Sequence, residues 1–373
     1  MRLIATNIVA ANRRRGIRYN PPMNIAQMLH HRALPSPEGT TPIPRHCTFG
    51  LISFVVLALV LTMTGAATAQ TAWKPGKLVE IVVGVAPGGG VDRTARLLQK
   101  VLQDKRLLEV AASVINKPGG GGILGQVYLN QHAGDAHYLE ISATSVITNQ
   151  ITGKSPSSWS DFTPIAMLCD EYIGFVVKAD SPLKNGADLA ALLKLDASAL
   201  PAGIATSAGN TNHIALALLA KRAGGDAKKL KVVVFGSGGE STTALMGGHV
   251  GIVTAPAASA LSGVQSGALR MLAVAAPRRL DGPLATVPTW KELGYDIVVT
   301  NWRPVLGPRG LTAAQVAFWE ERLWRFTQTE DWKHELESTG AVAHYMNSRE
   351  LAQYLAAQHA EFKIVLAEIG LAR

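Results

Sequence analysis

Residues Val79–Lys100 read VEIVVGVAPGGGVDRTARLLQK and combine a strand, a glycine-rich turn and a helix. Apolar residues from Ile81 to Val85 predict a short strand, which Pro87 and three glycines interrupt, and apolar residues at helical spacing follow. Three consecutive glycines let the backbone approach another molecule closely, because no Cβ stands in the way. The amides that open the helix point outward at the positive end of its dipole. This segment therefore predicts a cradle for an anionic group such as a carboxylate or a phosphate.

Two more strand–loop–helix units lie further along the chain. Strand Ala202–Ala205 leads into a loop at 206–213, TSAGNTNH, which offers hydroxyl and amide groups and no carboxylate. Strand Lys231–Phe235 ends in a third loop at 236–240, GSGGE, and a helix follows each loop. Loops of this kind on separate units predict a ligand held in a cleft between two lobes.

Strand and helix signals alternate from Lys77 to the end of the chain, which is typical of an α/β fold with mostly parallel sheets. Ser145 follows a strand predicted at Tyr138–Ala143, at the edge where ligands usually meet a parallel sheet. Further strands are predicted at Val110–Ile115, Phe162–Leu168, Tyr172–Lys178, Ile252–Thr254, Leu269–Ala275 and Val298–Gly307. Further helices are predicted at Ile123–Asn130, Gly186–Leu193, Ile214–Arg222, Ser241–Met246, Ala313–Thr327, Asp331–Ser338 and Ser348–Ile369.

The N-terminal segment at 1–69 predicts a leader with a secretory signal peptide. Its apolar run at Leu51–Met63 is shorter than a membrane span and is followed by Ala-Thr-Ala, so cleavage is expected after Ala69. An uncleaved N-terminal anchor is the alternative. About fifty residues precede the apolar run, more than an ordinary signal peptide carries, so we expect translation to start nearer Met23 or Met28.

The net charge of +9 comes mostly from this leader. Residues 1–69 hold seven of the 36 Lys and Arg residues and one of the 27 Asp and Glu residues, which leaves about +3 for the rest of the chain. Nearly neutral charge, without basic clusters around the aromatic residues, argues against nucleic-acid binding.

The chain has two cysteines, and Cys47 lies in the leader. Cys169 stands in the apolar stretch AMLCDEYIGF, which predicts a buried structural cysteine rather than a catalytic thiol, because no base is located beside it. An exported protein without an intramolecular disulfide fits a bacterial periplasm.

A G-x-G-x-x-G match at Gly120, Gly122 and Gly125, with Glu140 downstream, raises the alternative of a nicotinamide-dependent oxidoreductase. The Asn-Lys-Pro before these glycines disturbs the tight strand-to-helix turn that this fingerprint needs. No phosphate-loop, zinc-protease or nucleophile-elbow motif occurs in the sequence, and the histidines are too dispersed for a metal cluster. We predict no catalytic residue, no metal and no cofactor.

Four ionisable side chains lie near the predicted loops. Asp92 and Glu240 stand in first helical turns, where a capping or dipole role is favoured over that of a general base. For His213, a ligand contact or helix cap competes with plain solvent exposure. For Arg303, a cation beside the cleft competes with a salt-bridged surface residue.

Seven stretches of the chain resemble, in order, the Bug family of periplasmic solute receptors, which are the substrate-binding proteins of tripartite tricarboxylate transporters. They read VEIVVGVAPGGGVDRTARLL, INKPGGGGILG, SAGNTNHIAL, ALMGGHVGIVTAP, GALRMLAVAAPRR, VPTWKELGYD and NWRPVLGPRGL, the last being most similar to the TctC branch. The resemblance covers 73–373 and implies a two-lobed Venus flytrap fold, each lobe a mostly parallel sheet flanked by helices. We expect the first lobe at 73–177 plus 298–373 and the second at 178–297.

The resemblance implies a monomeric, non-enzymatic receptor that binds a small organic carboxylate between its lobes and delivers it to the membrane permease of the transporter. The ligand-binding residues carried over by motif or position are Gly88, Gly89, Gly90, Asp92 and Ser145 in the first lobe and Thr206, Ser207, His213, Ser237 and Gly238 in the second. The third loop departs from the family pattern, which reads closer to Lys-Gly-Gly, because Gly236-Ser237-Gly238-Gly239 lacks the cation.

Overall fold

The computed structural model describes residues 73–373, so the predicted signal peptide, the cleavage after Ala69 and Cys47 lie outside the described residues. Strands and helices alternate along the described chain, which confirms the predicted α/β fold. Within 73–373 no helix combines the length and the apolar character that crossing a membrane requires.

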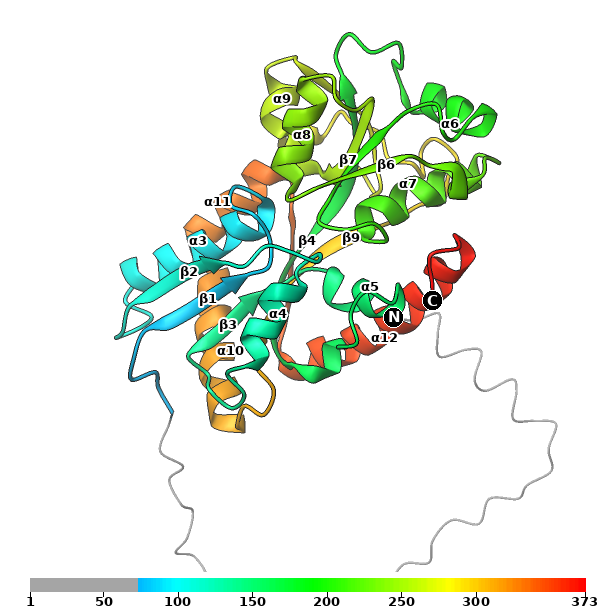
Figure 1. Ribbon diagram of the computed structural model, residues 1–373. Coiled ribbons are helices and arrows are strands. Elements are labelled where there is room, and N and C mark those ends of the chain that lie inside the picture. Colours follow the sequence, from blue (N-terminus) through cyan, green and yellow to red (C-terminus); the bar gives the residue numbers. More distant parts are fainter. Residues whose placement is uncertain (1–72) are drawn as a thin grey trace, which may run out of the picture. The chain divides into compact units, whose positions relative to one another are not determined.

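One sheet is built around β1, the strand that precedes the glycine-rich loop (Figure 1). Its strands, in spatial order, are β2 (Ala112–Asn116), β1 (Val79–Val83), β3 (Tyr138–Ile141), β9 (Thr300–Gly307) and β4 (Thr163–Lys178), with β10 (Val342–Met346) also on β4. β1 pairs in parallel with β2 and β3, whereas β9 and β10 pair antiparallel to their neighbours.

A second sheet starts from the C-terminal half of β4, which therefore belongs to both sheets. Its other strands are β7 (Ile252–Pro256), β5 (Ala202–Ala205) and β6 (Val232–Phe235) in that order, with β8 (Leu269–Val274) also on β4. β5 pairs in parallel with β6 and β7, and β4 runs antiparallel to β7 and β8.

Helices cover both faces of each sheet (Figure 1). On the first sheet, α3 (Gly90–Asp104), α10 (Ala313–Thr327) and α11 (Glu330–Thr339) share one apolar core, and α4 (Ile123–Asn130), α5 (Ser145–Ile151) and α12 (Ser348–Glu368) share another. The core of α4, α5 and α12 continues onto the second sheet, where it includes α6 (Gly186–Leu195) and α7 (Thr211–Arg222), and α8 (Gly238–Met246) and α9 (Leu261–Gln265) lie in a third core.

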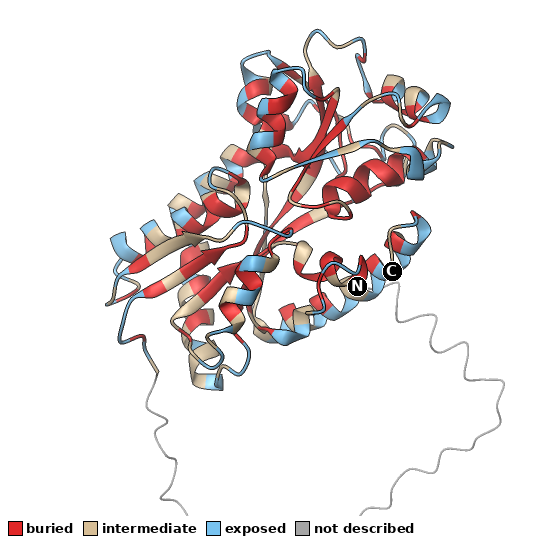
Figure 2. Ribbon diagram, viewed as in Figure 1, coloured by how far each residue is buried: buried red, intermediate tan, exposed pale blue. Residues whose placement is uncertain are grey.

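The buried residues follow the strands and the inner faces of these helices (Figure 2). α7 is exceptional, because every residue from Thr211 to Ala220 is buried. Cys169 is also buried, at 2% exposure, and burial raises the pKa of its thiol, as expected of a structural cysteine.

The strand pairing corrects two expectations. The sheets are mixed rather than mostly parallel, because β4 and β9 cross the centre antiparallel to their neighbours. The strands predicted at Phe162–Leu168 and Tyr172–Lys178 are one strand, since Asp170 and Glu171, which interrupt the apolar pattern, are buried and paired with His344 and Arg303. Helix α5 and strand β10 were not predicted. The lobe boundaries at 177/178 and 297/298 stay predictions.

Candidate functional site

Four helices begin around one pocket, each just after a strand and its loop. α3, α5, α7 and α8 start at Gly90, Ser145, Thr211 and Gly238. The space between the lining atoms of the pocket is about 520 Å³, a figure that includes open solvent. Its lining consists of Val85, Gly89, Gly90, Val91, Ala143, Thr144, Ser145, Ala205, Thr206, Asn210, Thr211, Asn212, Ser237, Gly238, Pro256, Ser259, Asn301 and Arg303.

The N-terminus of α3 has no side-chain cap. Its N-cap residue is Gly89, and Asp92 lies in the first turn. The Asp92 carboxylate accepts hydrogen bonds from Gly88 N at 3.0 Å, Arg96 Nε at 2.9 Å and Asn116 Nδ2 at 2.9 Å. Burial alone would raise the pKa of Asp92, but these three donors lower it overall, so the carboxylate is ionised and braces the loop. The first amides of α3 are thereby left for another acceptor.

The helices on the opposite side of the pocket are capped. Asn210 Oδ1 accepts from His213 N at 3.1 Å at the start of α7, and Ser237 Oγ accepts from Glu240 N at 3.2 Å at the start of α8. A Cβ built on Gly89 would stand 3.2 Å from Ser237 Cβ, so α3 and α8 begin side by side across the pocket. Both strand systems therefore contribute to one site.

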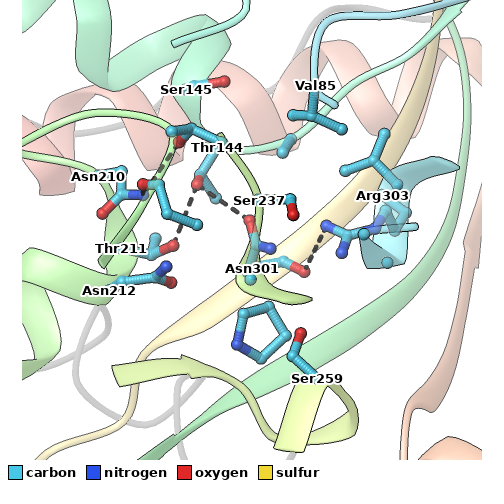
Figure 3. Close-up of a pocket in the computed structure, with 18 residues that line it drawn as sticks. Val85, Thr144, Ser145, Asn210, Thr211, Asn212, Ser237, Ser259, Asn301 and Arg303 are labelled. Carbon is cyan, nitrogen blue, oxygen red and sulfur yellow. Dashed lines mark hydrogen bonds between the residues drawn. The ribbon is translucent and has the colours of Figure 1, made fainter. Parts of the chain in front are cut away.

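A hydroxyl and amide network joins the two sides (Figure 3). Thr144 Oγ1 lies 3.3 Å from Thr211 Oγ1 and donates to Asn301 Oδ1 at 3.2 Å. Thr206 holds a left-handed backbone, φ 62°, that is unusual for a residue other than glycine, and Asn210 Nδ2 donates to its hydroxyl at 3.1 Å. Such strain is most often found at functional sites.

Arg303 is the charged side chain of this lining. Its guanidinium is 1% exposed and its Nη2 donates to Glu171 Oε2, while Glu171 is itself buried. The pair packs under the start of α3, because a Cβ on Gly90 would lie 2.9 Å from Arg303 Nη2 and 3.1 Å from Glu171 Oε1. Both hypotheses for this arginine are partly correct. It lies at the pocket, as the first expects, and it is salt-bridged, as the second expects, but it is buried rather than on the surface.

The structure brings six of the ten predicted ligand-binding residues into the pocket lining. They are Gly89, Gly90, Ser145, Thr206, Ser237 and Gly238. The other four lie outside this lining. Gly88 borders a neighbouring groove beside α8, and Asp92 braces the loop as described. Ser207 is buried with its hydroxyl donating to Asn149 Oδ1 at 3.4 Å.

His213 is buried in the first turn of α7, outside the pocket lining. Its Nδ1 accepts a hydrogen bond from Gly209 N at 3.0 Å, which places any proton of the neutral ring on Nε2. Burial, followed by the charge of Lys154, lowers the pKa of His213 to about 4. Of the alternatives considered from sequence, plain solvent exposure is wrong, because His213 is buried, and its ring accepts a hydrogen bond from the loop at the start of α7.

The lining also contains residues that were not selected from sequence. Asn210, Thr211 and Asn212 stand inside the second loop, whose hydroxyl and amide content was noted without choosing among its members. Thr144 carried a usable signal, because it follows β3 directly. The sequence gives no local signal for Asn301 or Ser259. Asn301 reaches the pocket because β9 pairs with the distant strand β4, and Ser259 reaches it through the chain after β7.

Two α/β sheets that share β4, with a polar pocket between helix starts, are consistent with the two-lobed fold of periplasmic binding proteins. The family model TctC, described as tripartite tricarboxylate transporter family receptor, matches residues 95–371. The chain belongs to this family, which consists of solute receptors and is not a class of enzymes.

Individual relatives agree with the family assignment. The chain is 29% identical over 311 residues to the UPF0065 protein in the gbd 5' region of Cupriavidus necator, covering 82% of this chain and 92% of that protein. It is 27% identical over 262 residues to BugT of Bordetella pertussis, covering 68% of this chain and 78% of that protein. The predicted resemblance to the Bug and TctC receptors is thus confirmed.

Solved structures share the fold. MatC from Rhodopseudomonas palustris with bound malate superposes with a TM-score of 0.70 at 23% identity, covering 78% of this chain and 99% of that chain. An R. palustris protein with adipate gives a TM-score of 0.73 at 22% identity, covering 80% of this chain and 99% of that chain. None of these relatives supports the nicotinamide-dependent alternative.

The glycine loop of that alternative has another geometry here. Gly119 to Gly122, which connect β2 to α4, all have positive φ, and three of them line a groove together with the end of β6. Glu140, the acid expected to bind a ribose, is 2% exposed inside the first sheet, and burial raises its pKa to about 8. A protonated, enclosed carboxyl is unsuited to that role.

Proposed function

We propose that this chain is a periplasmic receptor that binds a small organic carboxylate in the described pocket and passes it to the permease of a tripartite tricarboxylate transporter. The observation that carries the proposal is the uncapped start of α3, whose glycines face the capped starts of α7 and α8 across the pocket. Free amides at a helix N-terminus bind anions without a dedicated cation. Family membership and the malate and adipate of two structural neighbours favour a carboxylate as that anion.

The binding mechanism is closure of two lobes about their connecting strands. β4 runs through both sheets, and the segment before β9 returns to the first sheet beside it, so these segments serve as the hinge. Contacts between loops hold the closed form: Lys154 Nζ donates to the carbonyl of Ala208, and a Cβ on Gly121 would lie 2.8 Å from Ser207. A ligand that touches both sides favours closure by its differential affinity for the closed state.

Within this proposal, the ligand touches the six predicted residues of the pocket lining, and Asp92, Ser207 and His213 position the loops around them. The lobes divide at 177/178 and 297/298, the mature receptor begins after Ala69 and acts as a monomer, and it releases its ligand chemically unchanged. The pocket lining supports the last of these statements, because the described residues offer amides, hydroxyls and one paired arginine but no nucleophile with a base beside it.

A ligand screen tests this function. Thermal unfolding of the protein, purified from the periplasm of an expressing bacterium, would be followed with a panel of mono-, di- and tricarboxylates. We expect at least one carboxylate to stabilise the protein by about 2.7 kcal/mol at a concentration of 100 times its Kd. Uncharged amides and esters of the same acids serve as controls and are expected to do little. Stabilisation by the esters alone, or by nicotinamide dinucleotides, would refute the proposal.

A further inference from the structure

The pocket holds a cation whose charge is already balanced. Arg303 is the one charged residue among the described lining residues, and the guanidinium is 1% exposed. Its Nη2 donates to Glu171, and its Nη1 lies 3.5 Å from the backbone oxygen of Asn301. With Glu171 also buried, the pair presents almost no net charge to a ligand.

Charges in the surrounding first turns are balanced as well. Asp92 at the start of α3 is paired with Arg96 at 2.9 Å. Glu240 at the start of α8 accepts from Gly236 N at 2.9 Å and places a negative charge at the positive end of that helix. The start of α3, which has no side-chain cap, offers a ligand roughly half an elementary charge and can hold one carboxylate. The seven-residue helix α5 also starts without a side-chain cap, at Thr144.

Among the described lining residues, the charged partner available to a second ligand carboxylate is Arg303. That carboxylate would displace Glu171, which would then remain as an unpaired buried charge, a strongly unfavourable arrangement. A neutral group has no such conflict. Arg303 Nε is buried without a hydrogen-bond partner in the described structure, and hydroxyl and amide side chains of Thr144, Ser145 and Asn212 line the same pocket. A ligand hydroxyl or amide both donates and accepts hydrogen bonds, as these groups require.

Resting on the proposed function, we propose that the buried Glu171–Arg303 pair makes this pocket select small carboxylates of single negative charge, bearing hydroxyl or amide groups, over dicarboxylates of the same size. We call this pair the charge filter. The guanidinium can still donate hydrogen bonds to a ligand, but Glu171 cancels the positive charge that would stabilise a second carboxylate.

Isosteric ligand pairs test the filter in the unaltered protein. Succinate and succinamate, or adipate and adipamate, have nearly the same shape and differ by one negative charge. Titration calorimetry is expected to give at least about tenfold tighter binding of the half-amide. Equal or tighter binding of the dicarboxylates would overturn the charge filter and leave the proposed function standing. Absence of binding by every carboxylate of the panel to folded protein would overturn both.

Glu171→Gln tests the pair itself. Removing the balancing carboxylate gives the pocket a net positive charge, so the affinity ratio of dicarboxylate to half-amide is expected to rise about tenfold or more. Glu337→Gln, which removes an exposed carboxylate on α11, is the matched control and should leave the ratio within about twofold. Equal weakening of both ligands by Glu171→Gln would indicate a merely structural pair and overturn the proposal.

The double variant Glu171→Gln/Arg303→Gln covers the case in which the single variant fails to fold. It removes both charges, and circular dichroism would establish that it is folded. The preference for the half-amide is expected to persist, because the pocket remains neutral. A switch to dicarboxylates in this neutral variant would contradict the filter.

Discussion

Glu140 lies in β3 with its side chain 2% exposed, and its Oε2 has no hydrogen-bond partner in the described structure. Burial raises its pKa from 4.5 to about 8, and a hydrogen bond with Ser142 only partly opposes the shift. The unfolded chain releases this proton near pH 4.5 while the folded protein keeps it, so stability falls as pH rises between these values.

Glu140→Gln should therefore remove a pH-dependent loss of stability. We expect the difference in unfolding free energy, variant minus unaltered protein, to rise by roughly 2–4 kcal/mol as pH rises from about 5 to about 8. Urea unfolding at both pH values measures the difference. Parallel pH profiles for the two proteins would show that Glu140 is ionised in the fold.

His213 predicts the opposite pH dependence. Its pKa falls from 6.5 to about 4 in the folded protein, because of burial and then Lys154. The stability contributed by the neutral ring is complete above pH 6.5 and is lost as pH falls toward 4, since protonation of Nδ1 would oppose the amide of Gly209. His213→Asn keeps an acceptor for that amide but does not titrate in this range. It should therefore abolish up to about 3 kcal/mol of this acid-dependent loss of stability, and urea unfolding at about pH 7 and pH 4.5 measures the change. If the variant lost as much stability as the unaltered protein between about pH 7 and pH 4.5, a group other than His213 would be responsible for the loss.

At the residue scale, local chemistry could be predicted from sequence and long-range pairing could not. Cys169 was predicted as buried from its apolar neighbours, and the structure confirms it. The site residues stay a prediction, although the glycines and hydroxyls beside strand ends do reach the pocket. The sequence could not decide between the two hypotheses for Arg303, because its partner Glu171 is 132 residues away in sequence.

At the scale of the element, the α3 start is the part most open to test. Gly89 has an extended backbone, φ −80° and ψ 169°, that a valine tolerates, but its Cβ would approach Ser237 across the pocket. Gly89→Val should weaken carboxylate binding by at least about tenfold in calorimetry, with little change in unfolding free energy. Gly76→Val is the matched control, since nothing lies within 4 Å of a Cβ there. Undiminished affinity in Gly89→Val would exclude this loop from the site.

Element prediction succeeded where apolar spacing was regular. Strand Ala202–Ala205 and helix Ala313–Thr327 have the predicted bounds. The sequence predicts two strands in place of β4, because it gives no sign that Asp170 pairs with His344, at 2.7 Å, or that Glu171 pairs with Arg303. Helix α5 was missed because seven residues rich in hydroxyl, amide and β-branched side chains give a weak helical signal.

At the scale of the whole molecule, ligand binding should change compactness. The loops beside the pocket touch across it at Gly89 with Ser237 and at Gly121 with Ser207. In the proposed mechanism these contacts belong to the closed form, so the ligand-free protein in solution should populate a more open form with fewer of them. Small-angle X-ray scattering is expected to show a smaller radius of gyration when a saturating carboxylate is added. An identical radius with and without bound ligand would argue against hinge closure.

The most direct measurement is a crystal structure of the protein with the tightest carboxylate from the screen. We predict that its carboxylate oxygens accept hydrogen bonds from the first amides of α3, at Gly90 and Val91, while the rest of the ligand contacts residues that open α7 and α8. A ligand bound elsewhere, or one whose carboxylate faces away from α3, would contradict the proposed site.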